Sequence, residues 1–124
     1  MLDHVGIGVS DFGRAQDFYD RALKPLGIDR LHGDNATFAG YGEAPKPIFW
    51  IGHEQGSPAR THVAFTAADR QSVDQFYSAA LAAGGRDNGP PGLRTQYHPD
   101  YYGAFVLDPD GHNIEAVCHK PAAP

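Results

Sequence analysis

An internal repeat limits the folds open to this chain more than any other feature of the sequence. The segment DHVGIGVSDFGRAQDFYDRALKPLG (residues 3–27) aligns without a gap with THVAFTAADRQSVDQFYSAALAAGG (61–85), at a constant offset of 58. Among the matching pairs are His4 with His62 and Asp11 with Asp69, and Phe18-Tyr19 matches Phe76-Tyr77. Self-similarity at a fixed period indicates a duplicated structural unit. We therefore expect two copies of one module.

Both halves of the repeat predict the same order of elements. An alternating run (2–9 and 61–67) predicts a strand, and Asp11 or Asp69 is suited to cap the helix that follows. Apolar residues spaced by three and four give each helix one buried face, and Gly27 and Gly84-Gly85 can end the helices in a left-handed conformation. Three strand-like segments then follow each helix, at about 28–33, 36–41 and 47–53 and at about 86–88, 102–107 and 113–118.

These elements predict an α+β fold built from two tandem βαβββ modules within a single domain, residues 1–124. Module 1 covers 1–55 and module 2 covers 59–119. The Gly/Pro-containing stretch 56–59 is the expected hinge, and 120–124 is expected to be a frayed tail. The segment DPDGH (108–112) predicts a tight turn in which Gly111 has a positive φ.

Composition excludes several classes of function. The net charge of -5 and the lack of a Lys/Arg cluster argue against nucleic-acid binding. No apolar run is long enough to cross a membrane. A single cysteine, Cys118, excludes an internal disulfide and favours a reducing cytoplasm. A soluble cytoplasmic protein with no nucleic-acid or membrane partner is expected.

Two histidines occupy equivalent positions on the first strand of each module. Because side chains alternate along a strand, His4 shares a face with Gly6 and Gly8, while His62 shares one with Ala64 and Thr66. Glycine inside a strand often marks the close approach of a ligand or of another backbone. A single histidine of this kind is more often a hydrogen-bonded structural residue, but two at symmetric positions favour a shared binding site.

Three motifs stand out, with paired βαβββ units between them: LDHVGIGVSD (2–11), THVAFTAAD (61–69) and LDPDGHNIEAV (107–117). Together they resemble the vicinal oxygen chelate superfamily, which contains glyoxalases, extradiol dioxygenases and bleomycin- and fosfomycin-resistance proteins. The resemblance spans nearly the whole chain. It implies an open, U-shaped mixed β-sheet barrel with the helices outside, and a homodimer. It also implies a metal held by His4, His62 and Glu115.

The fourth metal position of that superfamily lies on the last strand of module 1, where this sequence departs from the pattern. Matching Ile48 with Ile114 places Phe49 opposite Glu115, and a shift of one residue places Trp50 there. Neither side chain binds a hard cation. His53, farther along the same strand, could substitute only if the register bulges. An aromatic residue at this position would form an apolar wall for the substrate.

Two imidazoles and one carboxylate suit a divalent metal ion such as Fe, Mn, Zn or Ni, with open positions for a substrate. The resemblance implies bidentate capture of neighbouring substrate oxygens and stabilisation of an oxyanion. A metal-dependent enzyme of the glyoxalase (lactoylglutathione lyase) or dioxygenase type, acting on a small oxygenated molecule, is therefore expected.

A second group of reactive side chains lies in LRTQYHPDYYG (93–103). We expect His98 to act as a general acid or base, and Tyr97 or Tyr102 to hydrogen-bond a substrate oxygen. Arg94 could hold an anionic group and Tyr101 could contact substrate. The structural alternative is an aromatic loop that packs at a rim or at a dimer interface.

Two alternatives to the enzyme stay open. One is a non-catalytic dimer that sequesters a small molecule, as bleomycin-resistance proteins do, and the other is a family member whose ligands are relics. Metal analysis of the purified protein would separate them from the enzyme.

Overall fold

The computed structural model describes residues 1–123. The first module contains β1 (Val5–Val9), α1 (Phe12–Ala22), the short 3₁₀ helix η1 (Lys24–Leu26), β2 (Asp29–Gly33), β3 (Phe38–Glu43) and β4 (Lys46–His53). The second contains β5 (His62–Thr66), α2 (Arg70–Ala82), β6 (Arg86–Asp87), β7 (Gly92–Leu93), β8 (Tyr102–Leu107) and β9 (Asn113–Cys118).

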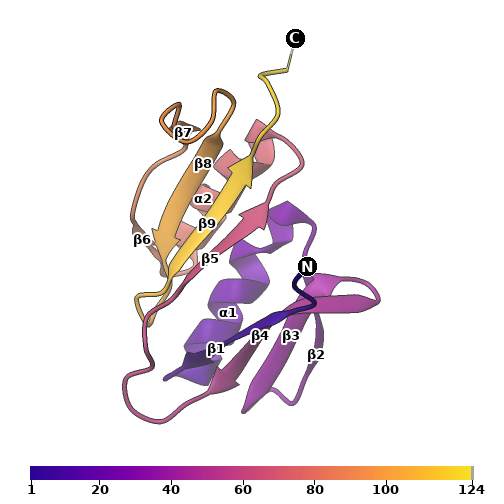
Figure 1. The fold of residues 1–124 in the computed structure, drawn as a ribbon. Helices are drawn as coiled ribbons and strands as arrows, with labels where there is room; N and C mark the ends of the chain where they lie inside the picture. The colour runs from indigo at the N-terminus through magenta and orange to yellow at the C-terminus, as the bar shows by residue number, and fades with distance from the viewer. Residues whose placement is uncertain (124) are drawn as a thin grey trace.

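Each module forms its own mixed sheet (Figure 1). The strand order is β1-β4-β3-β2 in the first sheet and β5-β9-β8-β6 in the second, with β7 also paired to β8. In both sheets the first strand of the module is parallel to the last and lies at the edge. Within residues 1–123 no strand pairing joins β1 to β5, so the sheets do not close into a barrel. The α+β fold with two repeated modules and an open sheet arrangement is confirmed.

Both helices begin where the sequence predicts and α2 ends just before Gly84, whereas α1 ends at Ala22 and Gly27 closes η1 instead. The carboxylate of Asp11 accepts a hydrogen bond from the backbone N–H of Arg14 at 3.2 Å, and that of Asp69 accepts from Ser72 at 2.8 Å. These bonds satisfy amides that the first helical turn leaves free. Gly27 and Gly84 have φ angles of 77° and 99°, in the left-handed region that glycine adopts without strain.

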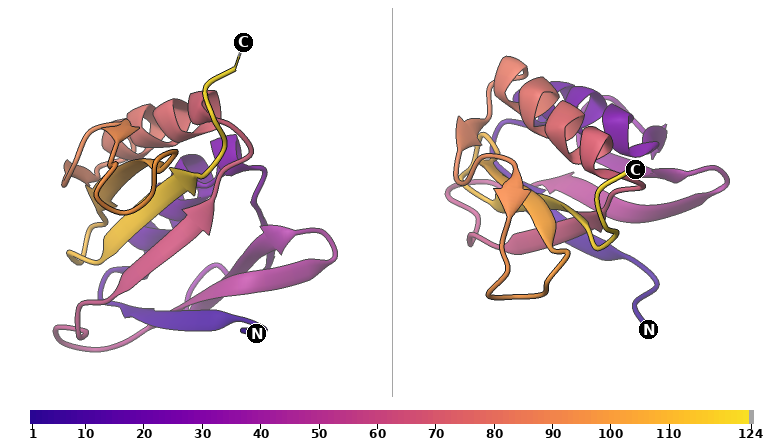
Figure 2. Two further views of the ribbon diagram at one scale, coloured as in Figure 1. Left: turned by 45° about the horizontal axis from the view of Figure 1, so that its top comes forward. Right: turned by 90° about the horizontal axis from the view of Figure 1, so that it is seen from above.

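Both helices pack against each other on one side of the two sheets (Figure 2). The side chains between the helices and the sheets form one continuous core. Phe49 of β4 meets Phe65 of β5 at a ring-centroid distance of 5.2 Å, and Tyr19 of α1 meets Phe49 at 5.0 Å. The modules therefore share their hydrophobic core and leave the opposite face of each sheet uncovered by helices.

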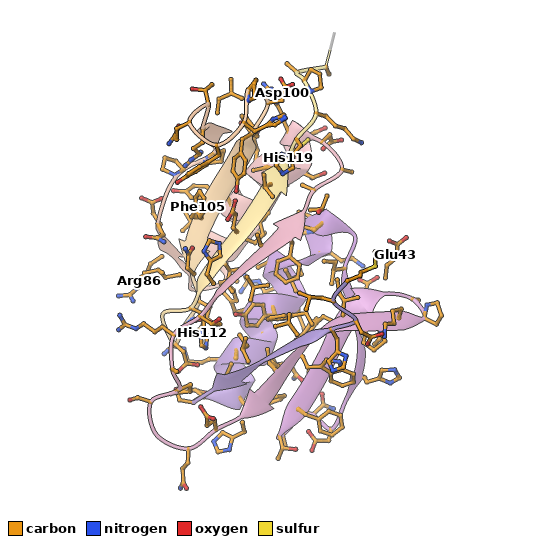
Figure 3. The ribbon with its side chains drawn as sticks, in the orientation of Figure 1. Glu43, Arg86, Asp100, Phe105, His112 and His119 are labelled. Carbon is orange, nitrogen blue, oxygen red and sulfur yellow. The ribbon has the colours of Figure 1, made fainter. Side chains whose placement is uncertain are left out.

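The turn 108–112 ties the second module to the first. The buried carboxylate of Asp108 accepts from the Tyr19 hydroxyl at 2.5 Å and from the amide of His112. His112, which is fully buried, donates from Nε2 to the carbonyl of Gly8 at 2.8 Å and accepts at Nδ1 from the amide of Thr61 (Figure 3). Gly111 has the predicted positive φ, 88°. The turn thus joins the modules as well as the strands β8 and β9.

The strands expected at 102–107 and 113–118 have the predicted bounds, whereas the one at 86–88 is shorter. It is the two-residue strand β6, and β7 pairs separately with β8. The sequence NGPPG (88–92) accounts for this break, since proline cannot donate to a ladder. Within the described residues, no helix has the length and apolar character needed to cross a membrane.

Candidate metal centre

His62 and Glu115 lie together on the uncovered face of the second sheet. Because β5 and β9 are parallel and Ala64 pairs with Glu115, the His62 side chain can reach the carboxylate from the neighbouring strand. Nε2 of His62 lies 2.8 Å from Oε1 of Glu115. The glutamate is only 2% exposed, although it faces away from the core. The predicted inward orientation of Glu115 therefore corresponds to a buried carboxylate beneath a loop.

The loop between β7 and β8, residues 94–101, covers Glu115. The hydroxyl of Tyr101 donates a short hydrogen bond to Oε2 of Glu115. Gly103 makes this contact possible, because a Cβ there would lie 3.1 Å from Cε1 of Tyr101. Arg94 fixes the base of the loop by donating to the carbonyls of Gly92, Gly103 and Pro90. Its guanidinium also lies over the ring of Phe105. The hydrogen bonds of Arg94 thus stabilise the loop.

Burial and the adjacent Glu115 carboxylate raise the pKa of the Tyr101 hydroxyl well above its ordinary value. The phenol is therefore neutral at physiological pH and acts as a hydrogen-bond donor. With Tyr101 on Oε2 and His62 on Oε1, both carboxylate oxygens have a partner. A carboxylate whose two oxygens are held in this way is a candidate ligand for a cation.

His4 lies apart from this pair within the chain. The far end of β1 adjoins the start of β9, since His112 bonds to the carbonyl of Gly8 and Asn113 pairs with His62. Four residues of strand, about 13 Å, separate Gly8 from His4. The Nδ1 atom of His4 is 2.7 Å from Asp3 instead. Across residues 1–123 no three His, Cys, Asp or Glu side chains converge as metal ligands.

The residue equivalent to Glu115 in the first module is Trp50. Gly6 and Ala64 are equivalent in the repeat, and their parallel partners are Trp50 and Glu115. The alignment that placed Phe49 opposite Glu115 was wrong by one residue. Phe49 points to the opposite face, where it is fully buried against Tyr19. Of the two aromatic residues predicted to form a wall, only Trp50 has the required orientation.

Trp50 and two neighbouring rings form an aromatic shelf on the uncovered face of the first sheet. A Cβ at Gly40 would lie 2.6 Å from Cζ3 of Trp50, so the indole rests directly on this glycine. The ring of His32 is parallel to the indole, with centroids 6.0 Å apart, and Phe38 lies at 6.4 Å. A hollow of about 420 Å³ adjoins the shelf. The aromatic shelf, defined as His32, Phe38 and Trp50, is suited to contact a planar molecule.

The other predicted loop residues have different surroundings. The Tyr102 hydroxyl donates to Asp74 of α2 at 2.6 Å, which places it on the helix side, away from Glu115. Tyr97 is 64% exposed and packs edge-on against Tyr101. His98 packs edge-on against His119, which also contacts the Tyr101 ring. In Figure 3, Asp100 and His119 mark this end of the second sheet, and Phe105 lies farther along it. Tyr97 and His98 thus lie at the rim of the Tyr101–Glu115 contact.

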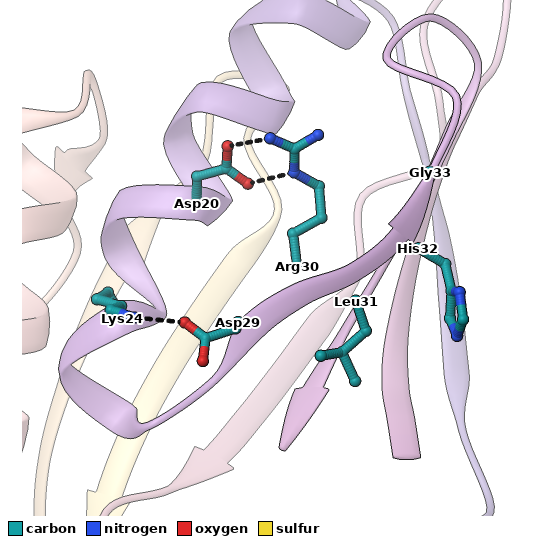
Figure 4. Close-up of a pocket in the computed structure, with 7 residues that line it drawn as sticks. All are labelled: Asp20, Lys24, Asp29, Arg30, Leu31, His32 and Gly33. Atoms are coloured by element: carbon teal, nitrogen blue, oxygen red, sulfur yellow. Dashed lines mark hydrogen bonds and ion pairs between the residues drawn. The ribbon is translucent and has the colours of Figure 1, made fainter. Parts of the chain in front are cut away.

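A shallow pocket between α1 and β2 offers no comparable chemistry. Its charged side chains pair with each other, Arg30 with Asp20 at 3.1 Å and Lys24 with Asp29 at 2.6 Å (Figure 4). Each charge is therefore already neutralised at an exposed surface.

The chemistry of His62 and Glu115 fits a divalent metal ion. Imidazole nitrogen and carboxylate oxygen are common ligands of Fe, Mn, Zn and Ni. Nε2 of His62 and Oε1 of Glu115 are 2.8 Å apart. Two neighbouring ligand atoms that each bind one metal ion at about 2.1 Å are expected to lie about 3 Å from each other, which is close to this separation. One chain supplies this pair, and its own His4 does not complete it.

Sequence reasoning missed Asn113. Its amide Nδ2 lies 3.3 Å from Nδ1 of His62. The available signal was its position two residues before Glu115, which places both side chains on the same face of a strand next to His62.

Two βαβββ modules, each with an open mixed sheet, are the architecture on which the comparisons with known proteins bear. Residues 1–116 match the profile of the Glyoxalase/Bleomycin resistance protein/Dioxygenase superfamily. The chain is therefore a member of that superfamily.

Solved structures give the same result. A glyoxalase/bleomycin resistance protein from Albidiferax ferrireducens T118 is 30% identical, with a TM-score of 0.82 over 98% of this chain and 99% of the other. A glyoxalase/bleomycin resistance protein/dioxygenase family enzyme from Burkholderia phytofirmans PsJN is 20% identical, with a TM-score of 0.71 over 96% and 98% of the two chains. The second likeness concerns the fold alone. No curated protein matches the chain significantly.

Proposed function

We propose that this protein is a metal-dependent enzyme that acts on a small oxygenated molecule. His62 and Glu115 are the ligands from one chain, and the partner subunit's His4 is the third, in a homodimer. One observation carries the proposal: an almost fully buried carboxylate lies beside an imidazole on a sheet face that no helix covers. Burial of a carboxylate is costly unless hydrogen bonds and a cation compensate for lost hydration.

The position of His4 supports a site completed by a second copy. His4 and His62 are equivalent in the repeat but stand at opposite ends of the space between β1 and β5. The uncovered sheet faces carry exposed apolar side chains, among them Phe38 at 43% and Ile48 at 39%. A dimer in which the first sheet of one copy faces the second sheet of the other would bury these side chains and bring the third ligand to Glu115.

The divalent ion, one of Fe, Mn, Zn or Ni, would act as a Lewis acid on neighbouring substrate oxygens and stabilise their developing negative charge. The residues of the chain supply the rest. Tyr101 donates to Oε2 of Glu115, so Oε1, the oxygen beside His62, is the one that would hold the ion. His98 at the rim of the loop is the candidate proton carrier.

Substrate contact is assigned to the aromatic shelf. Trp50 stands at the position of a fourth metal ligand and lies on the same sheet face as His4, the proposed third ligand. The sheet face that supplies His4 to the metal site therefore also supplies an apolar wall for the substrate. An unsaturated or aromatic substrate is favoured. Reaction types of the glyoxalase and dioxygenase kinds both fit this arrangement, and the cytoplasm is the proposed location.

Metal analysis of protein purified without chelators tests the proposal. We expect about one equivalent of metal per chain in the wild type and in His53→Ala, a control at an exposed histidine of β4. His62→Ala and Glu115→Ala are expected to lose most of it. Wild-type protein with no more metal than Glu115→Ala would contradict the proposal. A screen of the metal-loaded protein against catechols, hemithioacetals and epoxides would then identify the reaction.

A second candidate is a non-catalytic protein that sequesters a planar molecule, which the aromatic shelf favours. In that case planar aromatic ligands would quench Trp50 fluorescence equally in the wild type and in Glu115→Ala. The enzyme proposal expects such binding to weaken when the metal ligand is lost.

A further inference from the structure

Asn113 presents an unusual hydrogen-bonding arrangement beside the candidate metal ligands. Its Nδ2 donates to Nδ1 of His62 at 3.3 Å, while its Oδ1 is buried and has no hydrogen-bond partner among residues 1–123. Buried amide oxygens are seldom left without a donor, because they lose hydration without compensation. Only one of the two polar atoms of the amide is in use, so either atom can pair with His62 without breaking another contact.

The hydrogen-bond partners of the His62 ring indicate which tautomer it adopts. An ionised Glu115 can only accept, so Nε2 carries the proton in the 2.8 Å contact. Nδ1 of the neutral ring then has a lone pair and accepts from the Asn113 amide. A cation bound at Nε2 requires the opposite tautomer, with the proton on Nδ1.

The amide of Asn113 can serve both tautomers. When the amide of Asn113 turns by 180° about its Cβ–Cγ bond, its two polar atoms exchange places. Oδ1 then accepts from an Nδ1–H group of His62, and Nδ2 takes the unpaired position. Each orientation makes one hydrogen bond to His62, so the ring tautomer and the amide orientation change together. Metal-bound histidines commonly donate their other N–H to such an acceptor, and loss of that acceptor weakens metal binding about 10- to 100-fold.

We propose that Asn113 is a positioning residue that sets which nitrogen of His62 carries the proton. It donates to Nδ1 in the metal-free protein and accepts from Nδ1–H when Nε2 binds a cation. The metal-bound half of this inference rests on the proposed function, whereas the metal-free half stands on the contacts described above.

Nitrogen NMR of the histidine rings tests the metal-free half. Long-range ¹H–¹⁵N spectra at pH 8.5, with the His62 signals assigned by comparison with His62→Gln, would report the protonated nitrogen. We expect Nε2–H in the wild type and in Thr66→Val, a control on the same face of β5. Asn113→Asp, whose side chain can only accept, is expected to place a proton on Nδ1. Wild-type Nδ1–H, or an unchanged ring in Asn113→Asp, would overturn the inference.

Zn²⁺ titration by calorimetry tests the metal-bound half. Asn113→Leu removes both hydrogen-bonding groups and is expected to bind Zn²⁺ about 10- to 100-fold more weakly than wild type. Asn113→Asp keeps an acceptor and is expected to retain the affinity. Equal Zn²⁺ affinity in wild type and Asn113→Leu would overturn the positioning role. Wild type that binds no Zn²⁺ would overturn the proposed function instead, and the spectra of Asn113→Asp would still decide whether Asn113 sets the tautomer.

Discussion

Removal of the Tyr19 hydroxyl tests whether the two modules fold as one unit. Tyr19 belongs to α1 of the first module, yet its hydroxyl donates at 2.5 Å to Asp108, in the turn of the second. Both side chains are at most 1% exposed. In Tyr19→Phe the ring still fills the core, but Oδ2 of a buried carboxylate loses its donor. Oδ1 keeps the backbone amides of Asp110 and His112.

The expected loss follows from these contacts. A hydrogen bond to a charged group contributes about 1.5–3 kcal/mol, and two remaining amide bonds keep the carboxylate partly compensated. The free energy of unfolding is expected to fall by about 2 kcal/mol. If it decreases with urea by roughly 1.5 kcal/mol per M, this loss lowers the urea midpoint by roughly 1.3 M. Tyr41→Phe is the matched control. Its hydroxyl donates to Asp20, which is 32% exposed, so a loss below about 1 kcal/mol is expected.

Urea unfolding should be followed by two probes. Trp50, the only tryptophan, reports on the first module, and helical circular dichroism reports on both. Because the core is shared, both probes are expected to shift together in Tyr19→Phe. Two separate transitions, or a shift no larger than that of Tyr41→Phe, would refute this reasoning.

Three further predictions follow from single contacts. Burial raises the pKa of Tyr19, Tyr41 and Tyr101 in the folded protein. Unfolding therefore releases protons above pH 10, and the free energy of unfolding is expected to fall as pH rises past that value. A urea midpoint that is unchanged between pH 9 and 11 would contradict this. The hydrogen bonds from Ser72 lower the pKa of Asp69, so the contribution of Asp69 to stability is present above pH 3.8 and is lost as pH falls through the lowered pKa. Asp69→Ala should therefore be less stable than wild type at pH 7, and the difference should shrink in acid. A difference that stays constant with pH would count against the helix cap. Gly40→Ala places a methyl group where the Trp50 ring lies, so the emission maximum of Trp50 should shift relative to Gly13→Ala, a control at a helical position with room for the methyl group. Identical spectra would contradict the stacked position of the indole.

The repeat made most of the fold predictable. Matching positions in the two halves identified both helices with their caps, and alternation gave the faces of His62 and Glu115. Orientation on a strand depends on a period of two, so a single misaligned residue reversed the roles of Phe49 and Trp50. The aromatic shelf escaped sequence analysis because Gly40 and Trp50 come from different strands.

The loop residues were harder to predict than the strand residues. Arg94, Tyr101 and Tyr102 are close in sequence, but one ties the loop to carbonyls, one covers Glu115 and one faces α2. A polar residue in a loop carries no periodic signal for its direction. Asn113 shares a strand face with Glu115, but its contact with His62 depends on the parallel pairing of β5 with β9, which the sequence alone does not show.

The central claim, a metal site shared between two copies, is tested most directly by a mixed dimer. His4→Ala and Glu115→Ala chains with different tags would be co-expressed, and the mixed dimer purified and analysed for metal. Each variant alone is expected to bind almost none. The mixed dimer retains one complete site, made of His62 and Glu115 from the first chain and the partner subunit's His4, and is expected to hold one metal ion per two chains. A mixed dimer with no more metal than the two parent variants would contradict the account.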